Sequence, residues 1–198
     1  SHSMKPSLHF GNETIPAEAC YERYRAAAAA LHAWGIGEGE VFALMLHNEP
    51  VALELMLAGR WLGARFCPIN WHFKAQEVRY ILTDSGAKVL IVHADLLEAI
   101  AEGIPQGVKV FVVTPAAHTR KAFGLPNESW PLAQGFERWE DSRDVEGRTA
   151  VAQQSPGSAM LYTSGTTGQP KGILRSAASS AQLPGIQQMN RVALGIEP

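Results

Sequence analysis

The sequence is poor in cysteine, has no excess of either charge and contains no cluster of basic residues. Its two cysteines, Cys20 and Cys67, are too few for a disulfide framework, and no CxxC or Cys/His spacing indicates a zinc site. Reduced thiols are typical of the cytoplasm, so we expect a cytoplasmic protein. The 17 basic and 19 acidic residues leave a net charge of −2. This balance argues against nucleic acid and anionic membrane surfaces as main partners, because both require clustered Lys and Arg.

Long apolar runs are absent as well. The most apolar stretch, residues 51–62, is interrupted by Glu54 and Arg60 and is too short to span a bilayer, so we expect no stable membrane insertion. No apolar signal segment follows Met4, and residues 1–3 are interpreted as a vector remnant. The sequence does have the composition of a globular domain, with 46% hydrophobic and 18% charged residues.

Helix and strand patterns alternate along the chain. Tyr24, Leu31 and Trp34 recur at helical spacing, and residues 41–46 form a continuous apolar run that suits a buried parallel strand. The alternation predicts an α/β fold, a three-layer sandwich with a mainly parallel sheet. Residues 114–156 lack clear periodicity and are predicted to form an irregular connection with one helix near 133–141. The predicted helices are 17–34, 49–62, 75–83 and 94–102, and the predicted strands are 41–46, 65–69, 88–92, 108–113 and 158–162.

The segment that points to chemistry begins directly after strand 158–162. Its glycines let the backbone turn and expose successive N–H groups that can surround an anion, and its hydroxyls and one lysine add further donors and positive charge. The strand delivers them to the carboxyl end of the sheet, where α/β folds bind ligands. We therefore expect a polyphosphate to bind here. The segment reads Thr163-Ser164-Gly165-Thr166-Thr167-Gly168-Gln169-Pro170-Lys171-Gly172.

This segment is not a Walker-type P-loop. That motif requires glycine directly before its lysine and serine or threonine directly after it. Here Pro170 precedes Lys171 and Gly172 follows it, so the hydroxyl that would bind Mg²⁺ is missing from its place. An ordinary polar turn would account for one or two glycines, but not for ten consecutive residues of this composition after a buried strand.

The segment YTSGTTGQPKG, Tyr162 to Gly172, resembles the phosphate loop of the adenylate-forming superfamily, which includes acyl-CoA synthetases, luciferases and adenylation domains of nonribosomal peptide synthetases. Residues 30–50 resemble the first helix, turn and strand of that family, and residues 57–91 resemble its next block. The pattern PINW…EVRYIL within this block is similar to that of acyl-CoA synthetases acting on fatty or other hydrophobic acids. The resemblance extends over nearly the whole chain after Met4.

The resemblance implies a two-step reaction. A small-molecule carboxylic acid attacks the α-phosphate of ATP to give acyl-AMP and pyrophosphate, and the thiol of CoA then displaces AMP. Mg²⁺ shares the charge of the phosphates. Matched position by position, the implied phosphate-binding residues are Thr163, Ser164, Gly165, Thr166, Thr167, Gly168 and Lys171.

The resemblance also implies that residues 4–198 are a truncated N-terminal portion of such an enzyme. The adenine site, ribose-binding aspartate and catalytic lysine of the family have no counterpart here, so we expect no catalytic residue in this chain and no activity from it alone. A helix near 187–194 followed by Gly195 repeats the helix and turn of residues 31–44, but the expected strand does not follow. Three alternatives remain: a non-catalytic nucleotide- or partner-binding domain, an adenylating enzyme with a carrier-protein thiol as acceptor, and an enzyme that oxidises the adenylate.

A few polar and aromatic residues outside this segment also stand near predicted strands and helices. His47 follows a strand and is interpreted as a loop residue, and Asp84 as a solvated helix charge. Trp71 and His72 also follow a strand and are candidates for contact with substrate or CoA, although aromatic loop residues more often fill the edge of a subdomain. The open edge of an incomplete sheet would allow a homo-oligomer.

Overall fold

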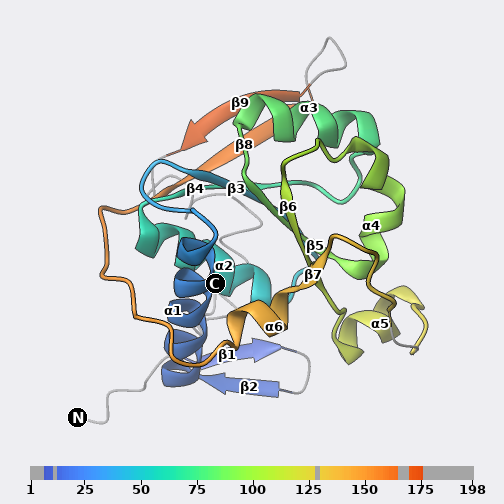
Figure 1. Cartoon of the computed structure of the whole chain (residues 1–198). Helices are drawn as coiled ribbons and strands as arrows, with labels where there is room; N and C mark the ends of the chain where they lie inside the picture. The colour runs from blue at the N-terminus through green and yellow to red at the C-terminus, as the bar shows by residue number, and fades with distance from the viewer. Residues whose placement is uncertain (1–6, 11–12, 128–129, 165–169, 176–198) are drawn as a thin grey trace, which may run out of the picture.

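A twisted, mainly parallel sheet forms the centre of the computed structural model, which describes residues 7–10, 13–127, 130–164 and 170–175 (Figure 1). Within these ranges the sheet has seven strands in the order β7-β6-β5-β3-β4-β8-β9. All neighbouring pairs are parallel except β8 and β9, which are antiparallel. The strands are β3 (Val41–Met45), β4 (Arg65–Pro68), β5 (Val89–His93), β6 (Lys109–Val113), β7 (Glu137–Arg138), β8 (Ser158–Ser164) and β9 (Pro170–Arg175).

Helices cover both faces of the sheet. Figure 1 shows α1, α2 and α6 on one side and α3 and α4 on the other, which confirms the predicted α/β architecture. A separate antiparallel hairpin, β1 (Ser7–Phe10) with β2 (Glu13–Pro16), precedes α1. The helices are α1 (Ala17–Ala33), α2 (Pro50–Leu62), α3 (Ala75–Ser85), α4 (Ala94–Ile100), α5 (Ala117–Phe123) and α6 (Trp139–Arg143), with a 3-10 turn over Ala101–Gly103.

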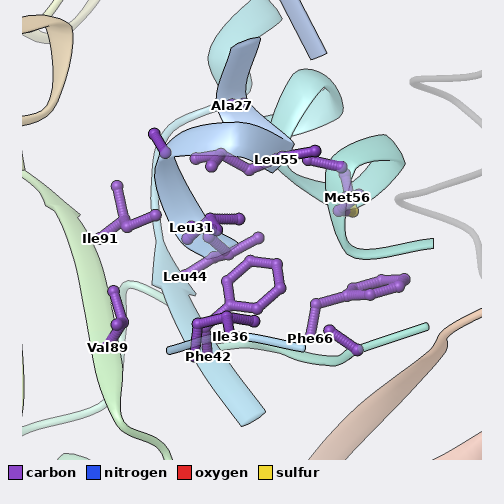
Figure 2. Packing of buried hydrophobic residues seen from close by; sticks show 14 of the residues in the cluster. Ala27, Leu31, Ile36, Phe42, Leu44, Leu55, Met56, Phe66, Val89 and Ile91 are labelled. Carbon is purple, nitrogen blue, oxygen red and sulfur yellow. The ribbon is translucent and has the colours of Figure 1, made fainter. Parts of the chain in front are cut away.

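The strands are apolar throughout because each of their two faces is covered. Along β3, Phe42 and Leu44 belong to the cluster under α1 and α2, whereas Ala43 and Met45 belong to the cluster under α3 and α4. Successive side chains of a strand point to opposite faces, so a strand buried on both sides reads as a continuous apolar run. Burying a side chain such as that of Phe42 contributes roughly 1.5–3 kcal/mol. Figure 2 shows the first cluster from close by.

Small residues allow α1 and α2 to pack closely on the sheet. Residues 27–30 of α1 are all alanine and all buried. On α2, a Cβ placed on Gly59 would lie 2.9 Å from the ring of Phe66 and 3.0 Å from that of Phe42. Both aromatic rings therefore occupy space that a larger residue at position 59 would need.

Helix ends follow ordinary capping chemistry. Pro50 stands in the first turn of α2, where its missing N–H costs no hydrogen bond. Gly63 ends that helix in the left-handed conformation with φ 68°, and Gly86 ends α3 with φ 69°. Glycine adopts this conformation at little steric cost, and the chain then turns into β4 and β5.

The sequence analysis did not predict the β1–β2 hairpin, the strands β7 and β9 or helix α5. The helix predicted near 133–141 begins later, because residues 134–135 form a turn with Gly135 at φ 92°, and the described helix is Trp139–Arg143. The helix predicted near 187–194 lies outside the described residues. None of the helices in the described ranges is both long and apolar enough to cross a membrane.

Candidate functional site

The predicted phosphate-binding segment lies at the turn between β8 and β9. Thr163 and Ser164 end β8, and Lys171 is the second residue of β9. In the antiparallel register, Thr163 is opposite Lys171 and Ser164 is opposite Pro170. Because β8 is parallel to the other central strands, its end lies at the carboxyl edge of the sheet, where ligands bind in α/β folds. The hairpin thus brings Thr163 and the backbone of Lys171 together at this edge, with Thr163 exposed.

The remaining predicted residues of the segment, Gly165, Thr166, Thr167 and Gly168, lie outside the described residues. They connect the two strand ends just described, so their positions along the chain are bracketed by Ser164 and Pro170.

Tyr162 anchors the end of β8 to the neighbouring helix. Its hydroxyl donates a hydrogen bond to Oδ2 of Asp84 on α3 at 2.6 Å, and its ring meets that of Tyr80 edge to face with centroids 6.5 Å apart. Burial, followed by the hydrogen bond and charge of Asp84, raises the pKa of Tyr162. Asp84 is exposed on its helix, as the sequence analysis expected, and it also accepts the hydrogen bond that holds the residue preceding Thr163.

Aromatic side chains gather at the end of the next strand, β4. The loop residue Trp71 is 46% exposed. Its ring centroid lies 3.7 Å from that of His72 and 6.3 Å from that of Phe123 on α5. The amide of His72 donates to the side chain of Asn70 at 2.9 Å, which holds the turn. Trp71 is thus half open to solvent rather than enclosed in a subdomain edge.

The ends of β3 and β5 are joined by two histidines. The amide of His47 donates to Nδ1 of His93 at 2.9 Å, and Nε2 of His47 lies 2.7 Å from Oδ2 of Asp95. Both histidines are buried. His47 is therefore part of a buried polar network, which corrects its interpretation as an ordinary loop residue.

The second histidine reaches the start of α2. Nε2 of His93 lies 3.0 Å from Oε2 of Glu49, a close contact that lacks the alignment of a regular hydrogen bond. The amide of Ala116 also donates to Glu49, at 3.2 Å. Burial acts to raise the pKa of Glu49, but the contact with His93 and the hydrogen bonds from Thr119 and Ala116 outweigh it and hold this pKa below its usual value.

A cavity of about 480 Å³ opens beside this network, between the β1–β2 hairpin, α1, α2, α5 and α6. Glu54 of α2 lies in its wall with Arg23 3.5 Å away and Arg143 3.7 Å away. Burial raises the pKa of Glu54 more than the two arginines lower it.

Sequence reasoning missed Glu49, Glu54, His93 and Asp95. The only signal for them was position: His93 directly follows the predicted strand 88–92, Asp95 comes two residues later, and Glu54 interrupts an otherwise apolar helix. A charged residue within a buried face indicates a partner, but the sequence does not say which one.

Known proteins are similar to this chain over most of its length. The family model described as "AMP-binding enzyme" matches residues 1–193. Long-chain fatty acid transport protein 2 of Rattus norvegicus is 32% identical over 179 residues, which cover 84% of this chain and 27% of that protein. L-proline--[L-prolyl-carrier protein] ligase of Streptomyces coelicolor is 30% identical over 178 residues, covering 87% of this chain and 31% of that ligase.

A solved structure is similar over the same region. The anthranilate CoA ligase AuaEII, in complex with anthranoyl-AMP, superposes with a TM-score of 0.69 at 26% identity, covering 87% of this chain and 32% of the ligase. The chain thus spans about a third or less of the lengths of the proteins that it matches.

Proposed function

We propose a function from one premise: this chain belongs to the AMP-binding enzyme family. The proposal is that the whole protein carrying this chain is an ATP-dependent acid–CoA ligase. It activates a hydrophobic carboxylic acid as acyl-AMP and transfers the acyl group to CoA. The observation that carries the proposal is the β8–β9 hairpin, which aligns Thr163 with Lys171 at the carboxyl edge of the parallel sheet.

The proposed role of this hairpin is to hold the β- and γ-phosphates of ATP. Hydroxyls and backbone N–H groups donate to phosphate oxygens, and a lysine adds positive charge, so together they stabilise the charge that develops on pyrophosphate as it leaves. The acid's carboxylate forms the new bond to the α-phosphorus while the bond to the pyrophosphate oxygen breaks. The residues assigned to this role are Thr163, Ser164, Gly165, Thr166, Thr167, Gly168 and Lys171.

Mg²⁺ accompanies ATP as a second source of positive charge on the phosphates. Among the described residues, no group of three or more His, Cys, Asp or Glu side chains is placed to hold a metal ion. We therefore assign no metal ligand within the described part of the chain.

The class of acid is proposed from the names of similar proteins. One relative is named for long-chain fatty acids, and the solved structure is that of a ligase for anthranilate. Both acids combine a carboxylate with a largely apolar body. A hydrophobic acid is therefore the proposed substrate, with CoA as the proposed acceptor.

A carrier-protein thiol is the second candidate acceptor. It is favoured by one observation, the similarity to a ligase named for a prolyl-carrier protein. The two acceptors share the first step, because both require acyl-AMP, and differ only in the thiol that displaces AMP.

The test is release of pyrophosphate by the full-length protein with ATP, Mg²⁺ and a panel of fatty and aromatic acids, with CoA or a carrier protein as acceptor. We expect pyrophosphate and acyl-CoA with at least one hydrophobic acid, and none from the 198-residue chain alone. Thioester on the carrier protein only would select the second acceptor. Binding of ATP without pyrophosphate from any acid would instead indicate a non-catalytic nucleotide-binding domain.

The role of Lys171 is tested by Lys171→Ala. Loss of a charged hydrogen bond of about 1.5–3 kcal/mol lowers kcat/KM for ATP by roughly 10- to 150-fold. Lys88→Ala is the matched control. Lys88 directly precedes β5, so it lies at the amino ends of the parallel strands, and it pairs with Glu40 at 2.9 Å. Equal kinetics of the two variants would contradict the assignment of Lys171.

A further inference from the structure

A second cavity lies at the carboxyl edge of the sheet, away from the β8–β9 hairpin. Its volume is about 220 Å³, and its walls come from the end of β1, the loops after β3 and β4, and α5. We call it the aromatic cavity, because aromatic rings form much of its wall. The lining residues that matter here are Leu46, His47, Asn48, Trp71, Thr119 and Phe123.

The imidazole of His47 is held in one orientation within this wall. Its side chain is 5% exposed, and its Nε2 lies 2.7 Å from Oδ2 of Asp95, whose side chain is 9% exposed. Within the described part of the chain, the other carboxylate oxygen, Oδ1, is buried without a hydrogen-bond partner. The imidazole of His47 is therefore the described hydrogen-bond partner of this buried carboxylate.

This pairing determines what the ring can offer to a ligand. A carboxylate only accepts hydrogen bonds, so the Nε2 of His47 carries a proton and donates it to Asp95. In the neutral imidazole the other nitrogen, Nδ1, is then an acceptor. No residue in the described ranges bonds to Nδ1 of His47. His47 lines the cavity, so its neutral ring can offer Nδ1 as an acceptor to a donor of a bound molecule.

The rest of the wall suits a flat apolar ring. The ring of Phe123 lies 4.7 Å from that of His47 with 40° between their planes, and it meets Trp71 edge to face at 79°. Phe123 is 53% exposed and Trp71 46% exposed, so both keep free aromatic surface. Aromatic rings gain about 0.5–1.5 kcal/mol from such offset or edge contacts. A cavity of roughly 150 Å³ is large enough for benzene, so this one has room for a ring with a small substituent.

The charges near the aromatic cavity further limit the class of ligand that it can bind. The carboxylate of Asp95 contacts the imidazole of His47, and the carboxylate of Glu49 contacts that of His93. The ring centroids of the two histidines are 5.1 Å apart. Negative charge so close disfavours an anionic ligand, including the carboxylate of an acid substrate or a phosphate. We propose that the aromatic cavity binds a neutral aromatic ring bearing a hydroxyl group, a phenol, whose O–H donates to Nδ1 of His47 while Phe123 and Trp71 contact the ring.

Ligand-observed fluorine NMR with 4-fluorophenol and fluorobenzene tests this proposal on the 198-residue chain. The two probes share the ring and differ in the donor. We expect 4-fluorophenol to bind roughly fivefold more tightly, which corresponds to one net hydrogen bond of about 1 kcal/mol. Equal affinity for the two probes, or binding of neither, would overturn the proposal.

Two variants separate the donor contact from the ring contacts. His47→Phe keeps a ring of similar size but removes both ring nitrogens, so the preference for 4-fluorophenol should disappear while fluorobenzene binds as before. Phe123→Ala removes an exposed side chain, which spares the core, and should weaken both probes to a similar extent. A phenol preference that persists in His47→Phe would contradict the assignment of Nδ1, whatever the full-length protein does with ATP.

Discussion

The hydroxyl of Tyr162 on β8 donates a hydrogen bond of 2.6 Å to the carboxylate of Asp84 on α3. The bond joins a strand to a helix 78 residues earlier in the chain, immediately before the exposed Thr163. This side-chain contact, together with the ring contact of Tyr80, holds the end of β8 against the helix layer. Because the proposed phosphate-binding segment begins at this point, the contact connects the stability of the fold to the position of the proposed site.

Tyr162→Phe removes this bond and keeps the ring. We expect the free energy of unfolding to fall by about 1.5–3 kcal/mol, the usual contribution of a hydrogen bond to a charged group. Urea denaturation measures it, and Tyr80→Phe is the control, since the described contact of Tyr80 with Tyr162 is between rings. If Asp84→Asn and Tyr162→Phe show additive effects in the double variant, the two residues are not coupled.

Gly157→Ala tests the close approach at the start of β8. A Cβ at this position would overlap the carbonyl oxygens of Ala64 and Gly59, and backbone atoms cannot move aside cheaply. We expect destabilisation of about 1–3 kcal/mol, typical of overpacking, and a weaker pairing of β8 with β4. The control is Gly37→Ala, where a Cβ meets nothing within 4 Å. Thermal denaturation in which both variants match the parent would refute the steric argument.

Glu54→Gln tests how the buried carboxyl of Glu54 makes the free energy of unfolding depend on pH. Burial raises the pKa of Glu54 above 4.5, its usual value, so the folded protein binds this proton more tightly than the unfolded chain does. The resulting stability is present below pH 4.5 and is lost as the pH rises through the folded pKa. Wild type should therefore lose stability relative to Glu54→Gln between pH 4 and pH 7, roughly the window of this linkage.

Urea denaturation at both pH values measures that difference. Glu98→Gln, at an exposed position on α4, is the control and should show no such trend. A wild-type protein that gains stability relative to Glu54→Gln on the same change of pH would show that Arg23 and Arg143 outweigh the cost of burial.

The two cysteines should differ sharply in reactivity. Burial raises the pKa of the Cys67 thiol to about 12, so almost no reactive thiolate forms at neutral pH. Cys20 is only partly buried. Iodoacetamide should therefore label Cys20 in the native protein and both cysteines in urea, as read by peptide mass spectrometry. Native labelling of Cys67 at a comparable rate would mean that α3 and the sheet separate readily.

The sequence predicted the parts of the fold that depend on local patterns. Buried strands such as β3 and β5 appear as apolar runs, and amphipathic spacing marked α1 and α3 to within a few residues. Strand β9 was missed because Pro170 and Gly172 are typical of turns and not of strands. Helix α5 was missed because its sequence, AHTRKAF, is short and polar, and Thr119 is its one buried residue.

The candidate site likewise has one part that follows from a local pattern and one that depends on long-range contacts. The proposed phosphate-binding segment is contiguous, so its composition is enough to predict a polyphosphate ligand. The pair His47 and Asp95 is separated by 48 residues and meets only because β3 and β5 are neighbours in the sheet. Strand order is a property of the whole chain, and no local pattern around either residue specifies it.

The pairing of β4 with β8 has a consequence for the order in which the molecule forms. Arg65 pairs with Ser158, and the indole of Trp61 bonds to the carbonyl of Val151, a contact between residues 90 apart. Closing so long a loop is slow, and a chain emerging from the ribosome folds its N-terminal part first. The helices and strands up to β6 can therefore associate while β4 still has a vacant edge. Among the described strands, the β8–β9 hairpin is then added after β3 to β6, so the residues proposed to bind phosphate come together on a scaffold that has already formed.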